Sequence, residues 1–284
     1  MLKRQRFRTG VVITMAFALF LSIPAPPASA MSSGDAIVAT FVPLGVVLGA
    51  TAASYLLYKN RLAQPADAKG CLGYRGPGEF FIGGFVGAGF IPHSTWTYRV
   101  GGINYSADAM KIDPGVTGGI KLGYFLESFP YFGVEAEGSI GSQRQPSQTL
   151  AVNPPQAGAT ALRVPGQTLL AWTMAFHLLG RYGFYQDAEV PFGRLQPYVG
   201  VGPGLVMLYA EADSAKNFSL ELEAGLRYMF TKHFGGFLEY KFSKQWSVEL
   251  ESQQVFLNTI GSASGRGVFD FDRHQAVVGL AYHF

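Results

Sequence analysis

The sequence predicts an all-β protein, an eight-stranded antiparallel transmembrane β-barrel, and three observations support this prediction. Apolar and polar residues alternate in eight segments after Gly78, and a period of two is the period of a β-strand. The connections between these segments alternate between short and long. Only 14% of the residues are charged, whereas soluble domains carry roughly 25%.

The composition also fits a sheet that faces lipid on one side. The chain contains 36 Gly, 23 Phe and 14 Tyr. Its mean hydropathy is only +0.17, as expected for a barrel that presents every second residue to lipid. Four of the 22 basic residues lie in the first ten positions, and removing them leaves 18 basic against 19 acidic residues. This balance leaves no basic patch that predicts nucleic-acid binding.

Residues 1–30 are predicted to be a signal peptide. Basic residues between Lys3 and Arg8 precede an apolar run of 13 residues from Val11 to Ile23, and Ala28-Ser29-Ala30 forms a cleavage site. The alternative is an uncleaved anchor, which is disfavoured because the apolar run is short for a bilayer span.

Residues 31–77 are predicted to hold an apolar helix and a linker. The 23 residues 36–58 contain no charge and are long enough to span a bilayer. Two interpretations stay open, a weakly inserting helix outside the barrel and an inner-membrane span. The polar residues 59–77 read as a linker, and the single Cys71 matches no metal-ligand spacing.

The barrel domain is predicted to cover residues 78–284. Its eight strands are expected at 79–90, 115–127, 131–142, 167–182, 195–210, 217–230, 235–252 and 273–284. Long polar segments at 91–114, 143–166 and 253–272 are expected to be extracellular loops, and the shorter connections periplasmic turns. In the seventh strand, Val248 and Leu250 are expected on the lipid face and Glu249 on the inner face.

The inner face of the barrel is predicted to carry charges of both signs. At eight strands the interior is only wide enough for side chains, so buried charges need partners. The predicted lumen charge network comprises Lys121, Glu135, Glu137, Arg181, Glu221, Glu223, Arg227, Glu239 and Lys241. A polar plug that stabilises the barrel is the favoured interpretation, and a gated narrow pore is the alternative. The glycines of Gly200-Val201-Gly202-Pro203-Gly204 are read as relief for crowding inside the barrel.

The closing strand carries the most specific signal. Residues Ala276, Val278, Leu280, Tyr282 and Phe284 form one apolar face that ends on an aromatic residue. Together with Gly225-Leu226-Arg227-Tyr228 and Phe237-Leu238-Glu239-Tyr240, this strand resembles the small outer-membrane β-barrel family of OmpA-like and opacity-type proteins. The resemblance implies a cell outer membrane location and barrel-assembly machinery that reads Tyr282 and Phe284.

The resemblance implies function only broadly. Outer-membrane lipid and lipopolysaccharide are the expected surroundings, and a surface ligand would bind through 91–114, 143–166 and 253–272. The first hypothesis is a structural, adhesion or surface-interaction role. The second is a narrow porin-like channel for small solutes or ions, and the third is a lipid A-modifying enzyme. No enzyme, cofactor or metal is predicted, because none of the five His has a Ser two positions later and none belongs to a ligand cluster.

Overall fold

The computed structural model describes residues 78–284 except 128, 211–212 and 259–260. All the regular secondary structure in this part of the chain consists of β-strands. No helix among these residues has the length and apolar character needed to cross a bilayer. The predicted signal peptide (1–30) and the predicted helix and linker (31–77) lie outside the described residues.

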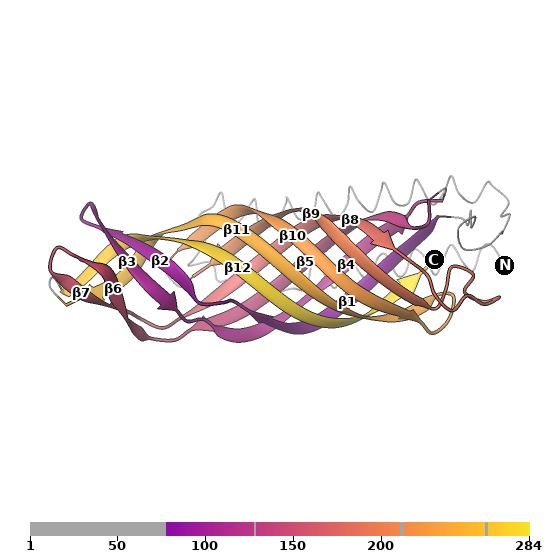
Figure 1. The fold of residues 1–284 in the computed structure, drawn as a ribbon, viewed down its shortest axis with the longest axis horizontal. Helices are drawn as coiled ribbons and strands as arrows, with labels where there is room; N and C mark the ends of the chain where they lie inside the picture. The colour runs from indigo at the N-terminus through magenta and orange to yellow at the C-terminus, as the bar shows by residue number, and fades with distance from the viewer. Residues whose placement is uncertain (1–77, 128, 211–212, 259–260) are drawn as a thin grey trace.

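The strands divide into long members of the barrel wall and short members of an extension at one end (Figure 1). The long strands are β1 (Glu79–Phe90), β4 (Asp113–Phe125), β5 (Phe132–Gln145), β8 (Gln167–Arg181), β9 (Leu195–Tyr209), β10 (Ser214–Met229), β11 (Phe234–Leu257) and β12 (Gly261–His283). The short strands are β2 (Ser94–Val100), β3 (Ile103–Met110), β6 (Gln148–Gln156) and β7 (Ala159–Val164).

The eight long strands form a closed antiparallel ring. Each pairs with the next in the order β1, β12, β11, β10, β9, β8, β5, β4, and β4 returns to β1. The prediction of eight strands is therefore confirmed, and β1 has the predicted bounds. The closing strand pairs with β1 as predicted, with Phe81 opposite His283 and Phe90 opposite His274.

The prediction that 91–114, 143–166 and 253–272 are loops is wrong. These segments contain β2 with β3, β6 with β7, and the last residues of β11 with the first half of β12. They build a second ring of six strands in the order β12, β2, β3, β6, β7, β11, stacked on the eight-stranded one. Figure 1 shows this extension at the end opposite the carboxyl terminus.

The extension folds because it has an apolar core of its own. Trp96 and Tyr98 of β2 are fully buried and pack with Phe269 and Phe271 of β12. The ring of Trp96 stacks on that of Phe269 at a centroid distance of 3.6 Å. The polar residues between the apolar ones point to solvent, and they make these strands look like polar loops in the sequence.

The predicted facing of the outer part of β11 is also wrong. Val248 and Leu250 are fully buried, and Glu249 is exposed. The register of β11 against β12 shifts between Gln245 and Val248, where Ser247 has a positive φ of 50°. A β-bulge adds one residue to a strand, so it exchanges inward and outward positions beyond it.

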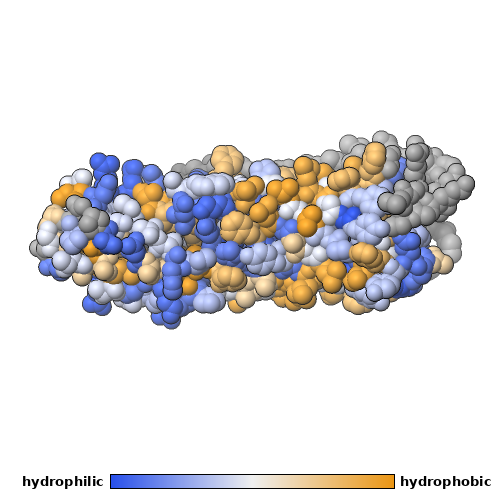
Figure 2. Space-filling view, in the orientation of Figure 1, coloured by the Kyte–Doolittle hydropathy of each residue, from blue (hydrophilic) through white to orange (hydrophobic). Residues whose placement is uncertain are grey.

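The outer wall carries an apolar band. Val278 and Leu280 of β12 and Leu238 of β11 are each more than half exposed, on the face predicted to contact lipid. Figure 2 shows apolar residues over the middle of the barrel and polar residues toward the extension. An outward apolar band with aromatic residues at its edges is the membrane-facing surface of such barrels, and the end with short turns faces the periplasm.

Candidate functional site in the barrel lumen

All nine predicted lumen residues point into the barrel and are buried. The most exposed of them, Glu137, retains 6% of its accessible surface. The alternation of each strand accounts for this placement, because every second residue of β4, β5, β8, β10 and β11 faces the interior. The nine residues do not form one network, however; they separate into a central cluster and three outlying positions.

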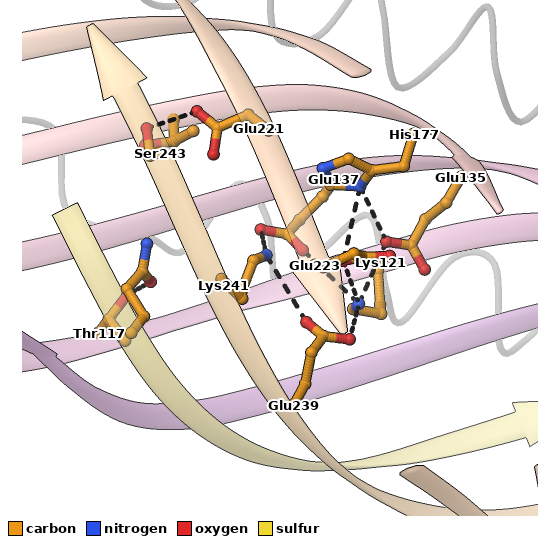
Figure 3. A network of polar contacts seen from close by, with 12 residues as sticks. Thr117, Lys121, Glu135, Glu137, His177, Glu221, Glu223, Glu239, Lys241 and Ser243 are labelled. Atoms are coloured by element: carbon orange, nitrogen blue, oxygen red, sulfur yellow. Dashed lines mark hydrogen bonds and ion pairs between the residues drawn. The ribbon is translucent and has the colours of Figure 1, made fainter. Parts of the chain in front are cut away.

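The central cluster is organised around the ammonium group of Lys121 (Figure 3). Its Nζ lies 3.1 Å from Glu135 and 3.7 Å from Glu137 of β5. It lies 3.3 Å from Glu223 of β10 and 2.8 Å from Glu239 of β11. One cation from β4 thus contacts four carboxylates on three other strands, which joins opposite walls of the barrel.

Three further side chains complete this cluster. The Lys241 ammonium contacts Glu137 and lies 3.8 Å from Glu239. His177 of β8 places Nδ1 3.3 Å from Glu135 and 3.6 Å from Glu223. The Tyr198 hydroxyl donates a hydrogen bond to Glu239. Neither His177 nor Tyr198 belongs to the predicted network, although both share the inward parity of their strands.

The glycines of β9 make room for these acids. A Cβ on Gly200 would stand 2.6 Å from Cγ of Glu223, and one on Gly204 would stand 2.5 Å from the Ser219 hydroxyl. Neither position tolerates a side chain without displacing its neighbours. This geometry confirms that the glycine run relieves crowding inside a narrow barrel.

The cluster also has the spacing of a cation site. Glu135, Glu137, His177 and Glu223 each offer one ligand atom, and these atoms lie within 4.8 Å of one another. The ammonium of Lys121 already lies between the three carboxylates of this group. The cation at the centre of these carboxylates is therefore supplied by the chain itself.

The three outlying members have different partners. Glu221 accepts hydrogen bonds from Ser219 and Ser243, at 2.6 and 2.7 Å. Arg181 donates to Glu79 at 2.5 Å and packs 3.5 Å above the Phe125 ring. Their partners were not predicted, since neither Glu79 nor the two serines were assigned to the network.

Arg227 departs most from the expectation that every buried charge is paired. Its guanidinium lies over the rings of Phe81, Tyr198 and Phe125, at 4.5, 5.1 and 5.7 Å. Its Nε and Nη2 have no hydrogen-bond partner among the described residues. Three aromatic faces stabilise the charge through cation–π interactions, but they do not replace hydrogen-bond acceptors.

A buried arginine that was not predicted lies in the lumen on the extension side of the cluster. Arg273 of β12 is 1% exposed and donates to the Thr173 hydroxyl of β8 at 2.6 Å, across the lumen. The signal was present in the sequence, because Arg273 has the same parity as the inward residues Gln275 and Val277.

Buried side chains lie at both ends of the lumen. On the periplasmic side, Phe192 is buried and its ring lies 4.1 Å from the Arg181 guanidinium. In the connection that carries Phe192, the backbone N–H of Val190 and the guanidinium of Arg194 donate hydrogen bonds to Asp187, and these bonds lower the pKa of its carboxyl group. On the other side, the apolar core around Trp96 fills the extension.

A pocket opens at the periplasmic mouth. It has a volume of about 240 Å³ and is lined by Val190, Phe192, Met229, Phe284 and charged residues including Glu79 and Lys232. The Glu79 carboxylate of this lining contacts the buried side chains of Arg181 and His283. The pocket therefore shares Glu79 with the ion pair that this residue forms with Arg181 of the lumen.

Comparisons with known proteins agree with this architecture. Residues 92–284 match the family model described as outer membrane protein beta-barrel domain. The crystal structure of OprG from Pseudomonas aeruginosa is similar at a TM-score of 0.50, with 15% identity over 74% of this chain and 98% of that chain. No sequence match was found among curated proteins.

Two other solved structures align less closely. The solid-state NMR structure of AlkL gives a TM-score of 0.39 with 17% identity, over 78% of this chain and 95% of that one. Ail of Yersinia pestis gives 0.33 with 16% identity, over 73% of this chain and 99% of that one. The family match covers most of the chain, so this protein belongs to the outer membrane protein β-barrel family and is located in the cell outer membrane.

Proposed function

We propose that this protein is a non-enzymatic outer-membrane barrel with a side-chain-filled lumen and a structural, adhesion or surface-interaction role. The observation that carries the proposal is the contact of Lys121 with four carboxylates from β5, β10 and β11. These contacts cross the barrel at its centre, and the apolar core of the extension closes the outer end. If the lumen is filled, partners of the protein bind to its external surface.

Single-channel recording tests the filled lumen. Folded protein inserted into planar bilayers is expected to give no steady conductance, with a porin of known conductance as the control for the bilayer. The folded state of the same sample is checked by its altered gel mobility before heating. Steady conductance that changes in Glu223→Gln would contradict the plug.

A narrow channel for small solutes or ions is the second candidate. It is supported by buried polar atoms without hydrogen-bond partners, which include Glu135 Oε2, Glu223 Oε1 and His177 Nε2. Buried polar groups normally have a protein or water partner, so these atoms favour water inside the lumen. The conductance measured in Glu223→Gln separates this candidate from the plug.

A lipid A-modifying activity is the third candidate, and no residue pair in the described part supports it. The five histidines lack the His-x-Ser pattern, and His177 contacts the lumen carboxylates Glu135 and Glu223. Mass spectra of lipid A from cells with and without the protein test this candidate. Identical spectra are expected.

The partners of the scaffold follow from its surface. Outer-membrane lipid and lipopolysaccharide would surround the apolar band, and the barrel-assembly machinery would read Tyr282 and Phe284. A surface ligand would bind the extension built from 91–114, 143–166 and 253–272. The strands there hold the exposed side chains rigidly, which suits a binding surface better than flexible loops would.

A further inference from the structure

The outer wall carries a group of aromatic side chains where its apolar band ends. This rim face is formed by Phe90 of β1, Tyr240, Phe242 and Trp246 of β11, and His274 of β12. The ring of His274 stacks on Phe90 at 5.0 Å with an interplanar angle of 9°, and it lies 5.0 Å from Phe242. Trp246 is 53% exposed, so a broad aromatic surface is available from outside.

Charged side chains lie within the rim face, between Phe242 and Trp246 of β11. Lys244 lies opposite Asp272 in the ladder, and its Nζ is 2.8 Å from Asp272 and 3.3 Å from Asp270. Asp270 also accepts a hydrogen bond from the Ser247 backbone at 3.0 Å. The sequence shows Lys244 as an interruption of the lipid face, and its two acidic partners become visible only in the fold.

The depth of the rim face in the bilayer follows from the residues on either side of it on the same strands. On the periplasmic side of it, Leu238, Val278 and Leu280 face outward and are more than half exposed. On the other side the outward residues are Glu249 and Arg266, which form an exposed ion pair of 3.2 Å. The rim face therefore lies where acyl chains end and headgroups begin, in the leaflet away from the periplasm.

We propose that the rim face binds the sugar headgroup of an outer-leaflet glycolipid. Exposed aromatic rings offer a flat apolar surface for the C–H face of a sugar. Ionised carboxylates only accept hydrogen bonds, and hydroxyl groups of a sugar are donors that fit Asp270 and Asp272. The acyl chains of the same lipid would continue along Leu238, Val278 and Leu280.

The local charge selects the sugar over its phosphate groups. Lys244 contributes one positive charge, and Asp270 and Asp272 contribute two negative charges within 3.3 Å of it. An anionic phosphate would be repelled by this excess. The inference rests on the outer-membrane placement and on the lipid partner proposed above, and it does not depend on whether the lumen conducts.

Native mass spectrometry of the full folded protein tests this site with three probes: lipid A, lipid A stripped of its phosphates, and phosphatidylglycerol. Lipid A stripped of its phosphates should bind at least as tightly as intact lipid A, and both should bind more tightly than phosphatidylglycerol. Trp246→Ala and the double variant Asp270→Asn/Asp272→Asn should each bind lipid A about tenfold or more weakly, as for truncation at the centre of a binding surface.

The control is Phe132→Ala, because Phe132 is 59% exposed at the periplasmic end of β5. It should bind lipid A like the parent protein, and gel mobility shows whether each variant is folded. Equal binding of phosphatidylglycerol, unchanged binding in both rim variants, or loss of binding on phosphate removal would each overturn the proposal. The lipid-binding experiment does not depend on conductance. A result that contradicts the rim site therefore leaves the proposal of a filled lumen unaffected, and the reverse is also true.

Discussion

At the scale of single residues, Lys121 is the side chain on which the lumen depends. It is fully buried and contacts four carboxylates that are themselves buried. Removing two opposite charges from water costs several kcal/mol per ion, so each member of the cluster is stable only with the others present. Arg227 shows a different solution, since aromatic rings surround its charge in place of carboxylates.

Replacing Lys121 by Met should lower the free energy of unfolding by about 3–5 kcal/mol, because the change leaves buried carboxylates without their central cation. Urea titration in detergent, followed by gel mobility, measures this loss. The control is Lys111→Met, since Lys111 and Asp113 form an exposed pair at 3.6 Å. Such surface pairs contribute roughly 0–1 kcal/mol. A loss in Lys121→Met no larger than the control would show that the cluster does not hold the walls together.

At the scale of elements, β11 and β12 link the two rings. Their inner halves border the charged lumen, and their outer halves border the apolar core of the extension. The change occurs at the bulge of Trp246 and Ser247, which turns Val248 inward. One extra residue thus lets a single strand serve two interiors with different chemistry.

The extension should lose its packing without loss of the barrel when Trp96 is replaced by Ala. Burial of Trp96 is complete, and its ring stacks on Phe269. A change of this kind costs about 3–5 kcal/mol in a packed core. Limited proteolysis should cut the extension of the variant faster than that of the parent, whereas gel mobility should still report a folded barrel. Resistance equal to the parent would mean that β2 does not hold the extension together.

At the scale of the whole molecule, the seam between β1 and β12 closes the barrel. Ten residue pairs join the two strands, from Phe81 with His283 to Phe90 with His274. At the end of the seam, the Phe284 backbone donates to the Phe80 carbonyl at 2.9 Å, and the two rings lie 5.1 Å apart. The aromatic terminus is therefore part of the closure, in addition to its proposed role as an assembly signal.

Deletion of Phe284 should reduce insertion into the outer membrane, and Phe284→Tyr should restore it, because the aromatic ring at the seam is what both roles require. Fractionation of the outer membrane with quantification of the folded form measures insertion. Normal insertion of the truncated chain would argue against both the seam and the signal. Refolding into detergent without assembly factors separates the two, since only a seam defect persists there.

The alternation of apolar and charged residues was sufficient to predict eight strands, their antiparallel order and the inward side of the nine charged residues. These features depend on a local period of two, which the chain carries whatever the remote contacts are. The signal in the closing strand was local as well, because its outward face carries an apolar residue at every second position from Ala276 to Phe284, and the last of these residues is aromatic.

The tertiary structure alone decided which charges meet and what the long connections become. Lys121 and Glu239 are 118 positions apart in the chain, and only the ring order brings them within 2.8 Å. From the sequence, Trp96 was predicted to lie in a polar loop and Val248 on the lipid face. In the structure, both belong to the apolar core inside the six-stranded ring. A local period specifies which side a residue faces, but the closure of each ring and the bulge in β11 specify what lies on that side.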